Sequence, residues 1–411
     1  MQSAGLSDFN TTNPMLIKYK TKIISTSLIF SLFNCLIFYS CKQSEASSPV
    51  NVFIPSPIAQ LSDTVHISQI VFTSDLHYGL KRAFRGKVVD ANVVNEAMVS
   101  QINLLPEAVF PRDKGINAGR KVGFIDYVAI NGDISNRQQS SIQSAYVSWN
   151  QFETDYLKGI HLKNKKNNEA EFLLTCGNHD VANAIGFSKT LNPATDNSVM
   201  VNIYNLMLHP IPQKTSRNYN YSSDKPNFSK DIDGVHFMFI TMWPDSAAQI
   251  WMEKDLSTID SNTPALIFTH DPIAGEPTHF TNPLGNHSMN ENYENEVEEN
   301  FKGNLALQKE LAVFLKNHPN IKAYFHGHTN YNQFYTFVGP DGNLDIKVFR
   351  VDSPMKGEFS ETDETKLSFQ VLSLDAGNQL LTVRECFWNQ SGAYSLISWG
   401  ASSTISLSQN K

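Results

Sequence analysis

Short apolar runs, each ending in a cluster of polar residues, recur along this chain. Aliphatic and aromatic residues make up much of each run, as is typical of β-strands, and the polar residues follow at its carboxyl end. Active sites of α/β proteins lie in the loops at the carboxyl ends of strands, so five such clusters in order predict a site built from these loops. The predicted strands cover residues 66–73, 124–130, 171–175, 265–268 and 321–325.

The segments between these strands have the spacing of amphipathic helices. Apolar residues recur at three- and four-residue intervals, which predicts helices over residues 91–104, 140–157, 246–256 and 304–317. The last of them closes before Pro319, a residue that cannot continue a helix. Strands that alternate with helices indicate an α/β fold.

The pattern changes after residue 328, where apolar and polar residues alternate in short stretches. Turn signals such as the Gly-Pro-Asp-Gly sequence at 339–342 separate them. This alternating pattern predicts a second sheet packed against the first. The predicted strands cover residues 333–338, 346–351, 366–374 and 380–387.

Length and composition allow a large core. The chain has 411 residues, of which 41% are hydrophobic and 18% are charged. We expect one catalytic domain over residues 65–388, an export segment at 1–41, a tether at 42–64 and a C-terminal extension at 389–411. The formal net charge of -7 does not suit a surface that grips a nucleic-acid backbone, so we expect no stable nucleic-acid complex.

The N-terminal region is predicted to be an export signal. Three lysines precede an apolar run at residues 23–40, and Cys41 follows it directly. Cys41 stands where a bacterial lipoprotein would be cleaved and lipidated, which would anchor the protein in the cell envelope. A single transmembrane anchor and a plain cleaved signal are the alternatives. All three place the folded part outside the cytoplasm, in the periplasm or at the cell surface.

The polar clusters supply the ligand types of a two-metal centre. Two divalent ions held close together need carboxylates and imidazoles, with one carboxylate bridging the pair. The candidate ligands among them are two carboxylates, three histidines and one asparagine, which is an unusual ligand. These candidate metal ligands are Asp75, His77, Asp133, Asn178, His270 and His328.

The ordered motifs resemble the signature of the calcineurin-like metallophosphoesterase superfamily. The matching elements are Asp75-x-His77, Gly132-Asp133, Gly177-Asn178-His179-Asp180, His270 and Gly327-His328. They extend from about residue 66 to residue 330. The resemblance implies a four-layer α-β-β-α sandwich of two packed mixed sheets, with the metal site at the carboxyl ends of strands.

The resemblance also implies roles for single residues. One metal ion would be held by Asp75, His77 and Asp133. The other would be held by Asp133, Asn178, His270 and His328. His179 would protonate the leaving oxygen instead of binding metal. Arg137 matches a phosphate-binding position of some branches of the family, and its alternative is a surface arginine at a helix start.

The last motif departs from the family pattern. The usual sequence is Gly-His-x-His, whereas this chain has Gly327-His328-Thr329-Asn330. Asn330 could donate its amide oxygen to the first metal ion, or water could take that position. A shifted register, in which His326 and His328 form the histidine pair, is the alternative.

The expected function is hydrolysis of phosphate esters, with a hydroxide that bridges two manganese, iron or zinc ions attacking phosphorus in line. His179 would act as the general acid, and Arg137 would bind a phosphate oxygen. Whether the substrate is a monoester or a diester stays open at this point. The rival hypothesis is a non-catalytic, metal-stabilised binding lipoprotein. The segment at 286–300 is expected to be a solvated loop, or else a lid over the site.

Overall fold

A computed structural model describes most of the chain beyond residue 66. The export segment, the tether, Arg137 and the 286–300 segment lie outside the described residues, so the hypotheses about them stay predictions. Within the described part, no helix combines the length and the apolar character needed to cross a membrane. The described ranges are 67–136, 143–181, 196–220, 223–275, 303–390 and 397–408.

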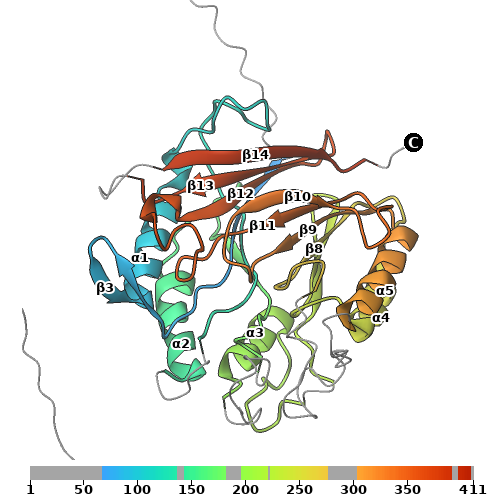
Figure 1. The fold of residues 1–411 in the computed structure, drawn as a ribbon, viewed down its shortest axis with the longest axis horizontal. Coiled ribbons are helices and arrows are strands. Elements are labelled where there is room, and N and C mark those ends of the chain that lie inside the picture. Colours follow the sequence, from blue (N-terminus) through green and yellow to red (C-terminus); the bar gives the residue numbers. More distant parts are fainter. Residues whose placement is uncertain are drawn as a thin grey trace, which may run out of the picture. The chain divides into compact units, whose positions relative to one another are not determined.

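Two six-stranded mixed sheets form the centre of the unit that spans residues 62–411 (Figure 1). The first sheet has the order β14-β13-β12-β1-β4-β5, and β1, β4 and β5 run parallel. Its strands are β1 (Ile67–Thr73), β4 (Tyr127–Ile130), β5 (Glu171–Leu174), β12 (Ser368–Asp375), β13 (Leu380–Phe387) and β14 (Ser398–Ser406).

The second sheet has the order β10-β11-β9-β8-β7-β6. Four neighbouring strands, β7, β8, β9 and β11, run parallel, and antiparallel strands close both edges. Its strands are β6 (Phe228–Ile232), β7 (Val235–Phe239), β8 (Ala265–Phe268), β9 (Ile321–His326), β10 (Gln333–Phe337) and β11 (Ile346–Arg350).

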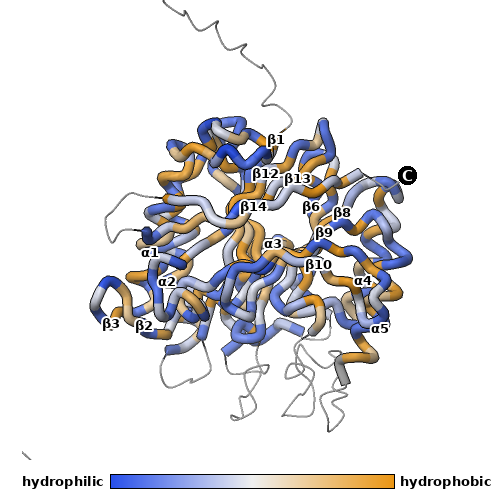
Figure 2. Tube along the Cα trace, turned by 45° about the horizontal axis from the view of Figure 1, so that its top comes forward, coloured by the Kyte–Doolittle hydropathy of each residue, from blue (hydrophilic) through white to orange (hydrophobic). Residues whose placement is uncertain are grey.

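Helices cover the outer faces of the two sheets, which gives the four layers α-β-β-α and confirms the predicted fold class. The first sheet is covered by α1 (Ala91–Ile102), α2 (Ala145–Phe152) and α3 (Ser198–Leu208), and the second by α4 (Ser246–Leu256) and α5 (Gly303–Asn317). Figure 2 shows hydrophobic and hydrophilic positions interleaved along the helices, as expected of helices with one face on a sheet. The remaining elements are the hairpin β2 (Lys81–Phe84) and β3 (Lys87–Asp90), a π-helical turn (Glu153–Leu157), and short 3-10 turns (Leu105–Glu107, Glu364–Lys366).

Side-chain caps fix where two of these helices begin. The Ser144 hydroxyl accepts a hydrogen bond from the Val147 amide at the start of α2. The Asp245 carboxylate does the same for the Ala248 amide at the start of α4. Each cap satisfies an amide that the helix itself leaves without a partner.

Aromatic side chains fill the space between the two sheets. Phe268 lies at their centre, and its ring stacks on Phe325 with 4.3 Å between centroids and on Phe239 with 5.1 Å. Phe72 reaches Phe268 from the opposite sheet, edge to face, at 5.5 Å. All four side chains are fully buried. This core joins the sheets, and the loops at their carboxyl ends extend from rigid strands.

Most predicted elements are confirmed, but the strands after residue 328 do not form a sheet of their own. The strands β10 and β11 complete the second sheet, whereas β12 and β13 pair with β1 and complete the first. The β1–β12 pairing joins segments some 300 residues apart, as in Ser68 opposite Leu374. Periodicity along the chain carries no information on such a pairing.

The predicted domain end at residue 388 is wrong, because the first sheet continues beyond it. The strand β14 lies in the supposed C-terminal extension and pairs antiparallel with β13. Its sequence is rich in serine, and most of its side chains are exposed or half-buried. An edge strand of this kind lacks the apolar alternation that marks a strand in sequence.

Removing the central ring of the inter-sheet core should destabilise the whole domain. We expect Phe268→Ala to lower the free energy of unfolding by about 3–5 kcal/mol, because it leaves a cavity among stacked rings. Equilibrium unfolding in urea measures the loss. Ile250→Ala, at a side chain that is 74% exposed, is the control and should change the value by less than about 0.5 kcal/mol. Equal effects of the two changes would contradict the assigned core.

Candidate metal centre

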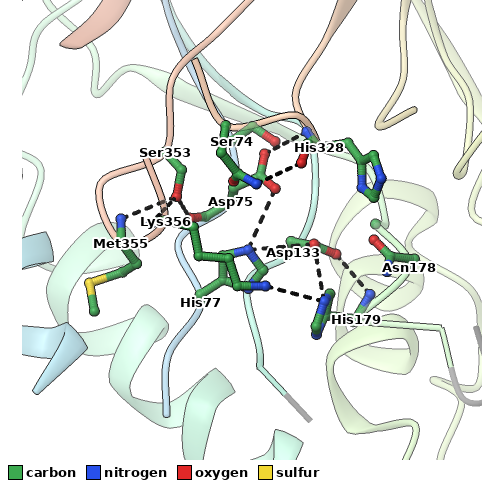
Figure 3. A network of polar contacts seen from close by, with 12 residues as sticks. Ser74, Asp75, His77, Asp133, Asn178, His179, His328, Ser353, Met355 and Lys356 are labelled. Carbon is green, nitrogen blue, oxygen red and sulfur yellow. Dashed lines mark hydrogen bonds and ion pairs between the residues drawn. The ribbon is translucent and has the colours of Figure 1, made fainter. Parts of the chain in front are cut away.

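The loops that follow β1, β4, β5, β8 and β9 converge on one site (Figure 3). The β1 loop carries Asp75 and His77, and the other four loops carry one candidate ligand each. All six predicted ligands meet here, in two groups that share the Asp133 carboxylate. The site lies at the carboxyl ends of the strands, as predicted for the fold.

Several ligand residues have left-handed backbone conformations. The φ angle is 59° at Asp75, 44° at His77, 52° at Asp133 and 65° at His328. Such a conformation costs a non-glycine residue about 1–2 kcal/mol, so the surrounding bonds must hold it. The Asp75 amide donates to the Gly132 carbonyl at 3.0 Å, and the His77 amide donates to the Asp133 carbonyl at 2.9 Å. The two loops thus fix each other's turns.

Glycine permits the close approach of two further loops. A side chain on Gly177 would collide with the Asp133 carboxylate, and one on Gly327 would collide with the Asp75 carboxylate. In the space these glycines leave, the His179 amide donates to Asp133 Oδ1 at 2.8 Å and the His328 amide donates to Asp75 Oδ2 at 2.9 Å. One oxygen of each carboxylate is held by backbone, and the other is left for a cation.

The first group surrounds a gap between Asp75, His77 and Asp133. His77 Nε2 lies 3.5 Å from Asp75 Oδ1 and 3.6 Å from Asp133 Oδ2, which is longer than a hydrogen bond. Asp75 Oδ1 and both ring nitrogens of His77 are buried without a hydrogen-bond partner among the described residues. Buried polar atoms of native proteins rarely stay unpaired. These residues therefore fit a metal ion that would take the place of the missing partners.

The second group is centred on His270. Its Nε2 lies 3.3 Å from Asp133 Oδ2, 3.0 Å from Asn178 Oδ1 and 3.3 Å from His328 Nδ1. Its Nδ1 donates to the carbonyl of Asn131 at 2.7 Å. This bond orients the ring with Nε2 facing the site, the arrangement that metal-binding histidines use. Carboxylate, amide and imidazole atoms suit a divalent ion.

The electrostatics of the site favour positive charge. Burial is the largest single effect on Asp75 and Asp133 and opposes their ionisation, but His270 and the other nearby histidines together outweigh it and lower the pKa of both carboxyls. Burial likewise opposes protonation of His270, yet Asp133 and Asp75 outweigh it and raise its pKa to about 10. A nearby positive charge stabilises the two buried carboxylates in their ionised form, and bound metal ions would stabilise them in the same way.

His179 lies beside the first group. Its Nε2 is 3.9 Å from Asp133 Oδ2, and its ring packs edge to face on His77 with 4.9 Å between centroids. Burial holds its pKa well below the usual range, against the attraction of Asp133. The distances would also allow His179 to act as a nitrogen ligand together with His77 and Asp133. Its assignment as general acid stays a prediction.

Asp180, the last residue of the Gly-Asn-His-Asp motif, binds backbone amides. Its oxygens accept from the amides of Ser135 and Gly177, each at 3.1 Å, and more weakly from that of Ile134. Burial and the neighbouring charge of Asp133 raise its pKa to about 6. Asp180 therefore joins the turn after β4 to the turn after β5, and it positions Asp133 and Asn178.

The contacts of His326 do not support the shifted register of the last motif. Its Nδ1 lies 2.9 Å from the Gly327 carbonyl and its Nε2 lies 3.2 Å from the Tyr335 hydroxyl, so both nitrogens have partners away from the metal groups. Asn330 donates to the His328 carbonyl at 2.7 Å, and its Oδ1 is buried without a hydrogen-bond partner among the described residues. That Asn330 Oδ1 binds the first metal ion stays a prediction.

The sequence missed Lys356, which reaches the site from the loop after β11. Its amine lies 3.4 Å from His179 Nε2 (Figure 3). Burial lowers its pKa, against the attraction of Asp133 and Asp75. No motif marks this lysine, because the Ser-Pro-Met-Lys-Gly segment around it has no metal-ligand spacing and Lys356 stands five residues beyond the predicted strand at 346–351.

Comparison with known families identifies one matching model. The model described as calcineurin-like phosphoesterase matches residues 68–331, well over half of the chain. Among curated proteins, no significant match is found.

Solved structures with a related arrangement include a dimetal phosphatase from Danio rerio, at 11% identity and a TM-score of 0.43, covering 83% of this chain and 99% of that one. Vps29 complexed with zinc from Entamoeba histolytica has 9% identity and a TM-score of 0.31, covering 82% and 99%. Phosphopantetheinyl hydrolase from Mycobacterium tuberculosis has 11% identity and a TM-score of 0.32, covering 70% and 91%. At these scores the family assignment rests on the family model alone.

Loss of the shared carboxylate should empty both metal positions. We expect Asp133→Asn to bind fewer than one manganese ion per chain, where the unchanged protein binds two, because one charge serves both groups. Metal analysis after gel filtration measures the ratio. Asp341→Asn, which makes the same change in an exposed turn, is the control. Retention of two ions by Asp133→Asn would rule out the bridging role.

Proposed function

This chain belongs to the calcineurin-like phosphoesterase family and is a metal-dependent hydrolase of phosphate esters, and we propose that two ions bridged by Asp133 and a proton supplied by His179 carry its reaction. The observation that supports this most is the membership of Asp133 in both ligand groups. A single carboxylate between two groups of ligands is what a pair of ions about 3.5–4 Å apart requires.

When bound, the two ions supply Lewis acidity and lower the pKa of coordinated water toward neutrality. The chain's own residues hold and orient them. Asp75 and His77 form one side of the site, and Asn178, His270 and His328 form the other. The hydrogen bond from His270 to the Asn131 carbonyl keeps Nε2 facing the site, so little reorganisation is needed when an ion binds.

In the proposed reaction, His179 gives a proton to the leaving oxygen. The residue is 7% exposed and its ring lies beside Asp133, at the edge of the first group. A general acid at such a position contributes about 10²–10⁴-fold in rate when the leaving group is poor. It contributes much less when the leaving group is already stable as an anion. A protein that only binds metal would have no need of such a group.

Hydrolysis by the manganese-loaded protein is the direct test. We expect turnover of a phosphate ester to be lost on treatment with a chelator and restored by manganese. His179→Asn should slow an alkyl ester about 10²–10⁴-fold and a nitrophenyl ester far less, because nitrophenolate leaves without a proton. Rates and bound metal are measured together.

The outcomes separate the two roles of His179 and the rival function. Loss of a metal ion in His179→Asn would make His179 a ligand. Full activity of His179→Asn toward the alkyl ester, with both ions bound, would exclude it as the acid. Two bound ions without turnover of any ester would favour the metal-stabilised binding protein.

We further propose that this domain acts outside the cytoplasm, attached to the membrane by a lipid on Cys41. The support is the lysine-led apolar run at 23–40 and the position of Cys41 directly after it. An acyl anchor would hold the site near the membrane at the end of the 42–64 segment.

Changing the anchoring residue should release the protein. On expression in a bacterium, we expect Cys41→Ser to move the protein from the membrane fraction to the soluble fraction, or to leave it with an uncleaved leader, and to prevent incorporation of labelled fatty acid. Cys386→Ser, at a buried cysteine of the folded domain, is the control. Lipid incorporation into Cys41→Ser would refute the assignment.

A further inference from the structure

We propose that Lys356 binds a phosphate oxygen of the substrate and makes this site prefer phosphomonoesters to phosphodiesters. The inference rests on the proposed hydrolytic function and adds a substrate class to it. It starts from the position of the amine, which faces the same edge of the site as His179 at 3.4 Å (Figure 3).

The loop that carries Lys356 is fastened to the metal loops. The Ser353 hydroxyl donates to the Asp75 carbonyl at 2.8 Å, and it accepts from the amides of Met355 and Lys356 at 3.1 and 2.9 Å. Further along, the Glu358 amide donates to the Asn330 carbonyl at 2.7 Å. The backbone of Lys356 therefore keeps a fixed relation to the turns after β1 and β9.

A buried arginine also holds this loop. Arg82, in β2, donates to the carbonyls of Pro354 and Ser360, each at 2.6 Å, and is 8% exposed. Gly357 gives no room for a side chain, because a Cβ there would meet the Ser360 hydroxyl and lie 2.7 Å from Asp352 Oδ1. The loop is a rigid support, and its lysine is not simply a surface side chain that happens to bend inward.

The charge of Lys356 has no direct partner in the described part of the chain. No carboxylate there forms an ion pair with its amine, although Asp133 and Asp75 attract it from farther away. Two divalent ions would bring four positive charges to the two negative charges of Asp75 and Asp133. With those ions in place, the ammonium group would face a positive site, and an incoming phosphate anion would balance its charge.

A phosphomonoester fits this position better than a phosphodiester. The monoester dianion has three non-bridging oxygens, whereas a diester carries one negative charge less and has a second organic group bonded to one of those oxygens. A lysine ammonium is a compact point charge that suits a phosphate oxygen in several orientations. One hydrogen bond between charged groups corresponds to about 10–100-fold in an equilibrium or specificity constant.

The test compares Lys356→Gln with the unchanged full-length protein, both loaded with manganese. We expect kcat/KM for a nitrophenyl phosphomonoester to fall about 10–100-fold and that for a nitrophenyl phosphodiester to fall less than about 3-fold. The affinity for inorganic phosphate, measured by calorimetry, should weaken about tenfold or more. Bound manganese should stay at two ions per chain. Lys356→Arg should keep part of the monoester preference, because it keeps the charge.

Lys347→Gln is the matched control, since it removes a lysine whose side chain is 38% exposed from β11, the strand that leads into the same loop. Equal losses for both esters, or unchanged affinity for phosphate in Lys356→Gln, would overturn the assignment. A loss of manganese or of thermal stability in both Lys356 variants would show a structural role instead. If the unchanged protein hydrolyses neither ester, the proposed function fails, while the phosphate affinities of the two proteins still decide the role of Lys356.

Discussion

Two buried carboxylates, those of Asp75 and Asp133, set the conditions for the rest of this structure. Each lies in a turn between closely packed sheets and is at most 1% exposed. Ionised groups at such depth are unfavourable unless they are paired and hydrogen-bonded. Backbone amides of neighbouring loops bind one oxygen of each. The other oxygens face histidines, and this is why ligands from separate strands come together at a single point.

The support around these carboxylates explains how loops can hold a site of defined geometry. The Asn131 side chain donates to the carbonyls of Thr269 and Phe325, which links the ends of β4, β8 and β9 across the two sheets. Asp180 joins two further turns in the same way. Because the strands beneath are joined by stacked aromatic rings, the loops inherit the rigidity of the core. Fixed positions of this kind favour tight binding of metal and substrate, because the side chains lose little conformational entropy on binding.

The sequence predicted most of the strands and the order of the candidate ligand residues, because each depends on local patterns, but it did not predict β6, β7 or α3. Buried strands such as β8 are short apolar runs, and the motif residues follow them directly. Relations between distant segments were not predictable. The pairing of β12 with β1, the edge strand β14 and the approach of Lys356 to His179 all depend on how separate parts of the chain meet. Hydrogen bonds from Arg82 to a loop more than 270 residues away leave no periodic trace.

The backbone at Asn330 limits what this position can become over evolutionary time. Its φ angle is 54°, in the left-handed region, where asparagine is among the most easily accommodated side chains. An exchange of histidine for asparagine in this turn changes the donor atom but leaves the fold of the loop intact. A valine or isoleucine would instead disturb the turn that presents His328. The backbone conformation alone therefore limits substitutions at this position to a few residue types, independently of metal binding.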